Sequence, residues 1–198
     1  MIAIVDYGVG NLCSVQKAFK FVGIDTVITK DKKVIDNCSH IVLPGVGAFS
    51  QAMELIKQED FDKFLLGQIA KGKPFLGICL GMQMLFERSL EDGCFEGLGV
   101  FKGEIKRFDI SLKVPHVGWN NIKVNSSSKI LLGLDNNMFY FVHSYYAPQQ
   151  QEFATSTCNY QIDFTASVEK DNVFATQFHP EKSGEVGLQI LKNFGGLK

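Results

Sequence analysis

The sequence carries little net charge, and its cysteines and histidines do not form the pairs or clusters that disulfide frameworks and metal sites use. Lys and Arg (20) nearly balance Asp and Glu (21), which gives a formal net charge of −1. This near neutrality argues against nucleic-acid or membrane-surface partners. The five cysteines are odd in number and include no Cys-x-x-Cys pair, which favours a reducing compartment. The four histidines lie far apart without ligand spacing, so we expect no metal and no cofactor.

No apolar run approaches the length that crosses a membrane. The first five residues are apolar, but Asp6 interrupts them and no basic stretch precedes them, so a secretory signal is not indicated. We therefore expect a cytoplasmic protein. With 45% hydrophobic residues the chain can bury a sizeable core. Because no linker, repeat or low-complexity stretch divides it, we expect residues 1–198 to form a single domain.

Strand and helix patterns alternate through the first half of the chain. Short apolar runs predict strands at residues 2–5, 26–28, 41–43 and 75–78. Apolar residues at helical spacing predict helices from Leu12 to just before Gly23 and over residues 52–56 and 61–69. This alternation is typical of an α/β fold with a doubly wound, mainly parallel sheet and helices on both faces.

The second half indicates strands separated by turn residues. We expect antiparallel additions that make the sheet mixed, at Val114 and at residues 122–124, 138–146, 153–157 and 173–178. A closing helix over residues 185–194 would pack its apolar side chains against the core.

The most specific local sequence is Gly-Ile-Cys-Leu-Gly at residues 77–81. An apolar run precedes it and residues 82–87 favour a helix, which predicts a strand, a tight turn and a helix with Cys79 at the tip. Flanking glycines suit such a nucleophile elbow, because its strained backbone leaves no room for neighbouring side chains. Free N–H groups at the helix start would stabilise the thiolate that attacks carbonyl carbon. A cysteine that merely fills the core is the alternative, but two glycines would pack poorly there.

A base for this nucleophile is available in Gln-Phe-His-Pro-Glu-Lys at residues 177–182. His179 and Glu181 are two residues apart, and on an extended segment such residues point to the same side. The carboxylate could then orient the imidazole while the other ring nitrogen reaches Cys79. We therefore predict a catalytic set of Cys79, His179 and Glu181.

Acyl transfer also needs N–H donors for the oxyanion that forms when sulfur attacks a carbonyl group. Pro-Gly-Val-Gly at residues 44–47 follows a predicted strand, and its glycines could turn backbone amides towards a bound carbonyl. Such a turn alone is usually only a loop. Together with the nucleophile, however, it predicts an oxyanion hole formed by Gly45, Val46, Gly47 and the amide of Leu80.

These three features together resemble the class I, or triad-type, glutamine amidotransferases, with their Gly-x-Cys-x-Gly elbow, His-Pro-Glu segment and glycine-rich oxyanion loop. Within that family, residues 4–12, 43–49, 114–120 and 141–145 resemble the glutaminase subunits of imidazole glycerol phosphate synthases. The resemblance runs from the first residues to the last helix. It implies hydrolysis of glutamine to glutamate and ammonia through a thioester on Cys79.

The resemblance also implies substrate contacts and a partner. Gln83 would bind the glutamine, and backbone groups of Ser144 and Tyr145 would hold its amino-acid end. Ammonia would pass to a (β/α)8-barrel cyclase subunit in a heterodimer that makes imidazole glycerol phosphate and aminoimidazole carboxamide ribotide in histidine biosynthesis. The residues at the family's partner-facing positions are Asn11, Pro115, His116, Trp119, Tyr140 and Lys182.

Other functions remain open at the level of sequence. A paralogue could deliver ammonia to a different barrel synthase, and the sequence does not distinguish the two partners. A degenerate amidotransferase fold could serve as a binding module, although all three predicted catalytic residues are present. The glutaminase of pyridoxal phosphate synthase has a similar size, but its oxyanion loop is of a Gly-Gly-Glu-Ser type that residues 44–47 do not match.

Overall fold

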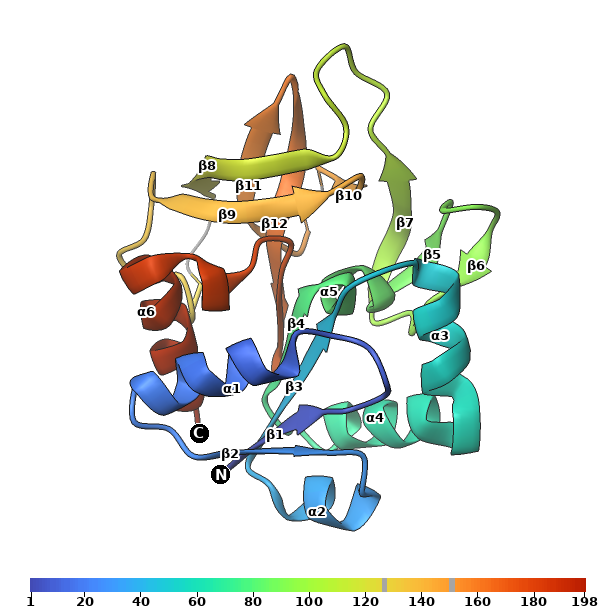
Figure 1. Cartoon of the computed structure of the whole chain (residues 1–198), viewed down its shortest axis with the longest axis vertical. Helices are drawn as coiled ribbons and strands as arrows, with labels where there is room; N and C mark the ends of the chain where they lie inside the picture. Colours follow the sequence, from blue (N-terminus) through green and yellow to red (C-terminus); the bar gives the residue numbers. More distant parts are fainter. Residues whose placement is uncertain (126–127, 150–151) are drawn as a thin grey trace.

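A block of parallel strands forms one end of the sheet, in the order β2-β1-β3-β4-β13 (Figure 1). These strands belong to a computed structural model that describes residues 1–125, 128–149 and 152–198. Both faces of β1 and β4 are buried, which explains their uninterrupted apolar sequences. The bounds of the parallel strands are β1 (Ile2–Val5), β2 (Thr26–Thr29), β3 (His40–Gly45), β4 (Phe75–Cys79) and β13 (Val173–Thr176).

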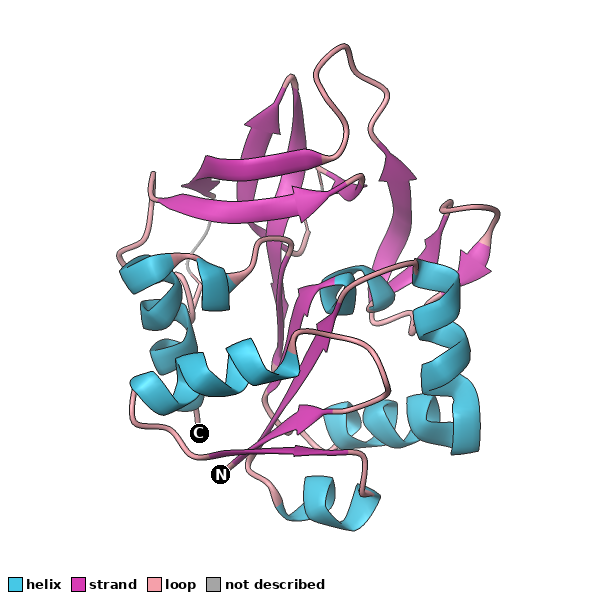
Figure 2. Ribbon diagram, viewed as in Figure 1, coloured by secondary structure: helices cyan, strands magenta, loops and turns pink. Residues whose placement is uncertain are grey.

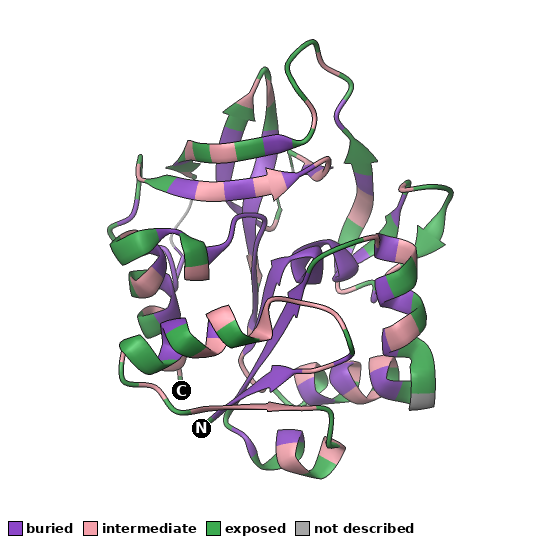
Figure 3. Cartoon of the chain, in the orientation of Figure 1, coloured by how far each residue is buried: buried purple, intermediate pink, exposed green. Residues whose placement is uncertain are grey.

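Helices cover both faces of this core (Figure 2). One face carries α1 (Leu12–Phe21) and α6 (Gly184–Gly195), and the other carries α2 (Lys32–Asn37), α3 (Phe49–Lys57) and α4 (Phe61–Ala70). Alternate side chains of β1 pack against the two helix layers. Ile2 and Ile4 belong to the apolar cluster of α1 and α6, whereas Ala3 and Val5 belong to that of α3 and α4. The central strands are accordingly buried along their length (Figure 3).

Antiparallel strands extend the core on the β13 side. The path continues through β12 (Ile162–Lys170), β10 (Tyr145–Pro148), β7 (Phe101–Arg107), β5 (Phe86–Ser89) and β6 (Phe95–Glu96), in which only the β5–β7 pair is parallel. A branch from β12 leads through β11 (Ala154–Tyr160) to β8 (His116–Val124) and β9 (Met138–His143). The predicted fold class, a doubly wound mixed sheet with antiparallel additions in the second half, is confirmed.

Several predicted elements were wrong in detail. The helix after Cys79 is the short α5 (Leu80–Met84), and it ends because Phe86 turns into β5 and pairs with Phe101 of β7. Val114 lies outside any strand, since β8 begins only after Pro115, which has no N–H to donate. The predicted strand at 138–146 is broken at Ser144 into β9 and β10. The sequence analysis did not predict β5, β6, β7 or β12.

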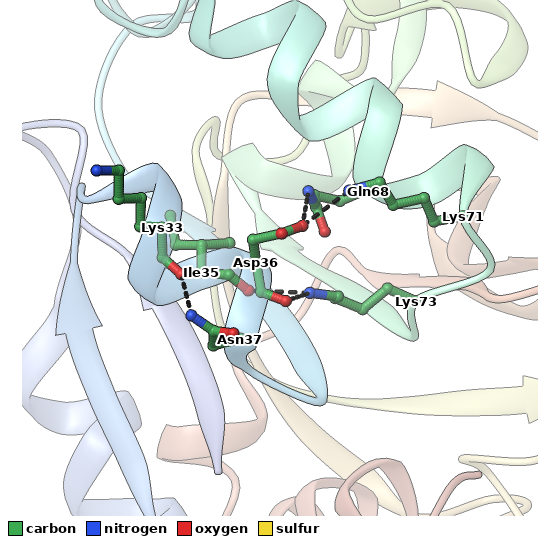
Figure 4. A network of polar contacts seen from close by, with 7 residues as sticks. All are labelled: Lys33, Ile35, Asp36, Asn37, Gln68, Lys71 and Lys73. Atoms are coloured by element: carbon green, nitrogen blue, oxygen red, sulfur yellow. Dashed lines mark hydrogen bonds and ion pairs between the residues drawn. The ribbon is translucent and has the colours of Figure 1, made fainter.

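Asp36 on α2 ties that helix to the neighbouring elements (Figure 4). Its Oδ1 accepts hydrogen bonds from Gln68 Nε2 and Lys71 Nζ at the end of α4, both at 2.8 Å. Lys73 Nζ donates to the main-chain carbonyls of Ile35 and Asp36, both at 2.9 Å. The bonds from Lys71 and Gln68 lower the pKa of Asp36. This polar network holds α2 in place at the end of the molecule opposite to the β8–β9 pair (Figure 1).

Across the part of the chain that the structure describes, no helix combines the length and apolar character needed to span a bilayer.

Candidate active site

Cys79 occupies a strained turn between β4 and α5. Its φ is +55° and its ψ is −108°, in a region that side-chain-bearing residues rarely adopt. The glycines on either side are required by close backbone approaches: a Cβ on Gly77 would lie 2.8 Å from the carbonyl oxygen of Gly81, and one on Gly81 would collide with the carbonyl of Leu43. The turn therefore has the geometry of a nucleophile elbow, and the packing around it maintains the strain.

His179 and Glu181 form a buried pair, with 2.8 Å between His179 Nδ1 and Glu181 Oε1. The two side chains are only 2% and 1% exposed. The expected extended segment is absent, however, because Pro180–Lys182 is a 3₁₀ turn that brings the carboxylate back to the ring. Two hydrogen bonds hold the backbone of His179 in place: its N donates to Tyr140 O (2.9 Å), and its O accepts from Ser183 Oγ (2.6 Å).

The electrostatics of this pair favour a protonated imidazole. Burial lowers the pKa of His179, but its interactions with the nearby Cys79 and Glu181 outweigh burial and raise it to about 10. Its buried Nε2 has no hydrogen-bond partner among the described residues. Burial, with a smaller contribution from negative charge at Cys79, also raises the pKa of Tyr7. The imidazole of His179 therefore lies between the carboxyl group of Glu181 and the sulfur of Cys79, and its interactions with both favour its protonated form.

A pocket of about 460 Å³ opens beside Cys79 and His179. Most of the residues predicted for the oxyanion hole and for glutamine binding line it: Val46, Gly47, Leu80, Gln83, Ser144 and Tyr145. Gly45 is not among the lining residues; it is the strand partner of Cys79. The pocket thus brings together segments that are separated in the sequence by more than 100 residues.

Further residues at the site were not predicted from the sequence. Gln177 donates from Nε2 to Cys79 Sγ (3.8 Å), and its Oε1 accepts from Gln83 Nε2 (3.0 Å). Its spacing of two from His179 was a usable signal. Glu91 also lines the pocket, and its carboxylate accepts from Phe49 N (2.8 Å) while burial raises its pKa. No local pattern marks Glu91, which lies in a loop.

Trp119, Tyr140 and Lys182 form an outward-facing group next to this site. Trp119 is 51% exposed and meets the ring of Tyr140 edge-on at 6.2 Å between centroids. Lys182 Nζ lies 5.8 Å from the centre of the same ring. Exposed Pro115 lines the pocket, and Asn11 is half-buried where α1 begins.

His116 does not belong to this outward-facing group. It is only 3% exposed, because β8 alternates and this position faces the core. Its Nδ1 lies 3.1 Å from His143 Nε2 on the paired strand. The expectation that the His116 side chain faces a partner is therefore wrong.

Among the described residues, no group of His, Cys, Asp and Glu side chains is arranged to hold a metal ion.

The family model for class I glutamine amidotransferases matches residues 3–195. The chain therefore belongs to the class I glutamine amidotransferase family. Solved structures have the same fold: a protein described as a glutamine amidotransferase aligns over 100% of both chains with a TM-score of 0.78 at 17% identity. The PurLQS structure from Thermotoga maritima aligns over 98% of this chain and 96% of that chain, with a TM-score of 0.73 at 20% identity.

Two curated relatives are more specific. The chain is 51% identical to the imidazole glycerol phosphate synthase subunit HisH of Caldanaerobacter subterraneus subsp. tengcongensis, over 100% of this chain and 98% of that protein. It is 47% identical to the subunit of the same name from Methanothermobacter thermautotrophicus, over 98% of this chain and 97% of that protein. The resemblance noted in the sequence is confirmed.

Proposed function

We propose that this chain is the glutaminase subunit of imidazole glycerol phosphate synthase, acting in histidine biosynthesis in the cytoplasm as a single domain. Its similarity over the full length to subunits named HisH supports this assignment. The observation that carries the chemistry is the shared pocket, in which Cys79 and His179 lie beside the glycine-containing turn at 44–47.

In the proposed reaction, the sulfur of Cys79 attacks the side-chain amide carbon of glutamine. His179 holds the proton from the thiol and delivers it to the amide nitrogen, so that the C–N bond breaks and ammonia leaves a thioester. Water then gives a proton to His179 and attacks the thioester, which releases glutamate and restores the thiol. Glu181 holds the imidazole through Nδ1, so that Nε2 is the atom that exchanges protons.

The tetrahedral intermediate needs donors for its oxyanion. We assign this role to backbone N–H groups of the Gly45–Val46–Gly47 turn and to the amide of Leu80. Three of these residues, Val46, Gly47 and Leu80, line the pocket. One such donor contributes about 3 kcal/mol to lowering the barrier, so a rotated peptide in this turn would suffice to keep the enzyme nearly inactive.

Glutamine would lie between Gln83 and the Ser144–Tyr145 segment. Gln83 Nε2 donates to Tyr145 O (2.9 Å), so these two sides of the pocket are held together. The carboxylate of Glu91 in the pocket wall suits the α-ammonium group of an amino acid.

Ammonia would pass to a (β/α)8-barrel cyclase subunit, because a route closed to water keeps it unprotonated and nucleophilic. We propose that this partner docks on a face made by Asn11, Pro115, Trp119, Tyr140 and Lys182. Trp and Tyr are the residue types that most often anchor interfaces, and here they contact each other next to Lys182.

The test is glutamine hydrolysis by the chain in complex with its cyclase partner. Cys79→Ala should abolish the release of glutamate, while added ammonium salt should still support the cyclase reaction of the same complex. Cys94→Ala, which changes an exposed cysteine, should behave as the unchanged protein. Glutamate release by the Cys79→Ala complex would contradict the proposal.

A further inference from the structure

Gln177 is buried between the nucleophile and the proposed substrate-binding side chain. It is 0% exposed and follows β13, with its backbone N–H held by Ala166 O at 2.8 Å. The two ends of its amide contact different residues: Oε1 accepts from Gln83 Nε2 at 3.0 Å, and Nε2 donates to Cys79 Sγ at 3.8 Å. Both partners are buried, so the amide group of Gln177 is held in one orientation.

The orientation of both amides follows from one fixed acceptor. Tyr145 O is a carbonyl and can only accept, so the atom of Gln83 at 2.9 Å from it must be the NH₂ nitrogen. The same nitrogen lies 3.0 Å from Gln177, so the facing atom of Gln177 must be its oxygen. The NH₂ group of Gln177 is therefore the part that faces the sulfur of Cys79.

The carbonyl oxygen of Tyr145 also contacts the ring of His143. His143 Nδ1 lies 2.8 Å from Tyr145 O and must donate to it, which makes His143 Nε2 an acceptor. His116 Nδ1 then donates to that nitrogen across 3.1 Å, and Asn120 Nδ2 lies 3.3 Å from the remaining nitrogen of His116. A continuous polar chain thus runs from β8 to the nucleophile.

We propose that Gln177 is a positioning residue for the acyl transfer, which donates an N–H to the Cys79 sulfur and locks the Gln83 amide with its oxygen free for the substrate. This inference rests on the proposed function for its substrate. Both hydrogens of Gln83 Nε2 are used, by Tyr145 O and by Gln177 Oε1. Gln83 Oε1 is then the group left to accept an N–H from bound glutamine.

The donor from Gln177 stabilises the thiolate against the thiol, because a buried N–H strengthens any anion to which it points. Other titratable groups line the pocket or interact with Cys79 or His179, and they come from several elements. They are Tyr7 beyond β1, Glu91 in the loop after β5, His143 on β9, and His179, Glu181 and Lys182 in the turn after β13.

The test is the pH dependence of Cys79 alkylation by iodoacetamide in the intact chain, followed by mass mapping of the peptide that carries Cys79. Gln177→Met removes the donor with little change in volume, and Gln177→Glu replaces it with an acceptor. We expect the midpoint of alkylation to rise by about one pH unit in Gln177→Met and by more in Gln177→Glu. Gln189→Glu, on the exposed face of α6, should leave the midpoint unchanged.

The kinetic counterpart is measured with the cyclase complex. Gln177→Met should raise KM for glutamine and lower kcat, each by about tenfold, because one change affects both the Gln83 amide and the sulfur. An unshifted alkylation midpoint in both folded variants would overturn the inference. Shifted midpoints in a chain that hydrolyses no glutamine would instead refute the proposed function and leave the contact of Gln177 with Cys79 established.

Discussion

At the scale of single residues, the nucleophile depends on how closely the backbone packs beneath it. Gly81 lies directly against the carbonyl of Leu43 on β3, and Gly77 lies against the carbonyl of Gly81. Any side chain at these positions would separate β3, β4 and α5, on which the conformation of Cys79 depends. The two glycines therefore contribute stability and reactivity together.

We predict that Gly81→Ala lowers the free energy of unfolding by about 3 kcal/mol, because the added methyl group overpacks against backbone that cannot rotate away. For a chain of this size, thermal unfolding should show a decrease in Tm of about 6–12 °C.

The matched control is Gly67→Ala in α4. A Cβ there meets nothing within 4 Å, and alanine favours the helix by about 0.5–1 kcal/mol, so Tm should stay the same or rise slightly. An equal loss of stability in both variants would contradict the packing argument.

The residues that sequence could identify are those marked by local patterns. Cys79 stands between glycines, and His179 and Glu181 lie two positions apart, so their chemistry is visible in short segments. Glu91 acquires its role only from its place in the pocket, which no local spacing encodes. Gln177 lies two positions from His179, but its contacts with Gln83 and Cys79 are tertiary. The burial of His116 could have been inferred from the alternation of β8, had its start been known.

At the scale of elements, β8 and β9 are joined by a side-chain hydrogen bond in addition to their backbone pairing. His116 and His143 are direct cross-strand partners, and burial lowers the pKa of His116 to about 4 and that of His143 to about 3. Both rings are therefore neutral in the folded protein at neutral pH, as their mutual hydrogen bond requires. An unfolded chain would protonate them below their ordinary pKa of 6.5.

This difference predicts acid sensitivity. Between about pH 6.5 and pH 4 the unfolded state binds more protons than the folded state, so the free energy of unfolding falls as the pH falls. At pH 5.0 each histidine accounts for a loss of about 2 kcal/mol. Denaturant unfolding at pH 7.5 and 5.0 measures the loss, and in His116→Gln it should be smaller by about 2 kcal/mol. An identical loss in the variant would show that His116 is not held neutral.

Elements buried on both faces were the easiest to predict. The strands β1 and β4 are continuous apolar runs because side chains on both sides enter a core. The strand β12 is also buried, but its inner positions include Thr165 and Ser167, and Ser167 is satisfied by hydroxyl pairs with Thr155 and Ser156 at 2.7 and 2.6 Å. Its apolar residues Phe164, Ala166 and Val168 alternate with these polar ones, so the strand lacks the continuous apolar run of β1 and β4, and its alternation was missed. Likewise β7 is charged on its exposed side.

At the scale of the whole molecule, the proposed docking face lies beside the reaction pocket. His179 N donates to the carbonyl of Tyr140, and Lys182 approaches the ring of the same residue. A partner that moved Tyr140 or Lys182 would therefore act directly on the segment that carries the base. This continuity offers a physical route by which a bound cyclase could affect glutamine hydrolysis.

We predict that Trp119→Ala weakens binding of the cyclase subunit by about 2 kcal/mol or more, because a large exposed aromatic side chain is the type that anchors interfaces. Thermal unfolding of the isolated chain should change little. Phe21→Ala, at the far end of α1 from Asn11, removes another exposed ring and should leave the affinity unchanged. Titration calorimetry measures both, and equal affinities for Trp119→Ala and the unchanged chain would place the interface elsewhere.

The most direct measurement is to quench the complex with acid during turnover of glutamine and to map the modified peptide by mass spectrometry. A glutamyl group on Cys79 is expected. Its amount should increase in His179→Asn if this change slows water attack more than thioester formation. In Cys79→Ser, no other cysteine should carry a glutamyl group. Steady hydrolysis of glutamine with an unmodified Cys79, or with the label on another residue, would contradict the account.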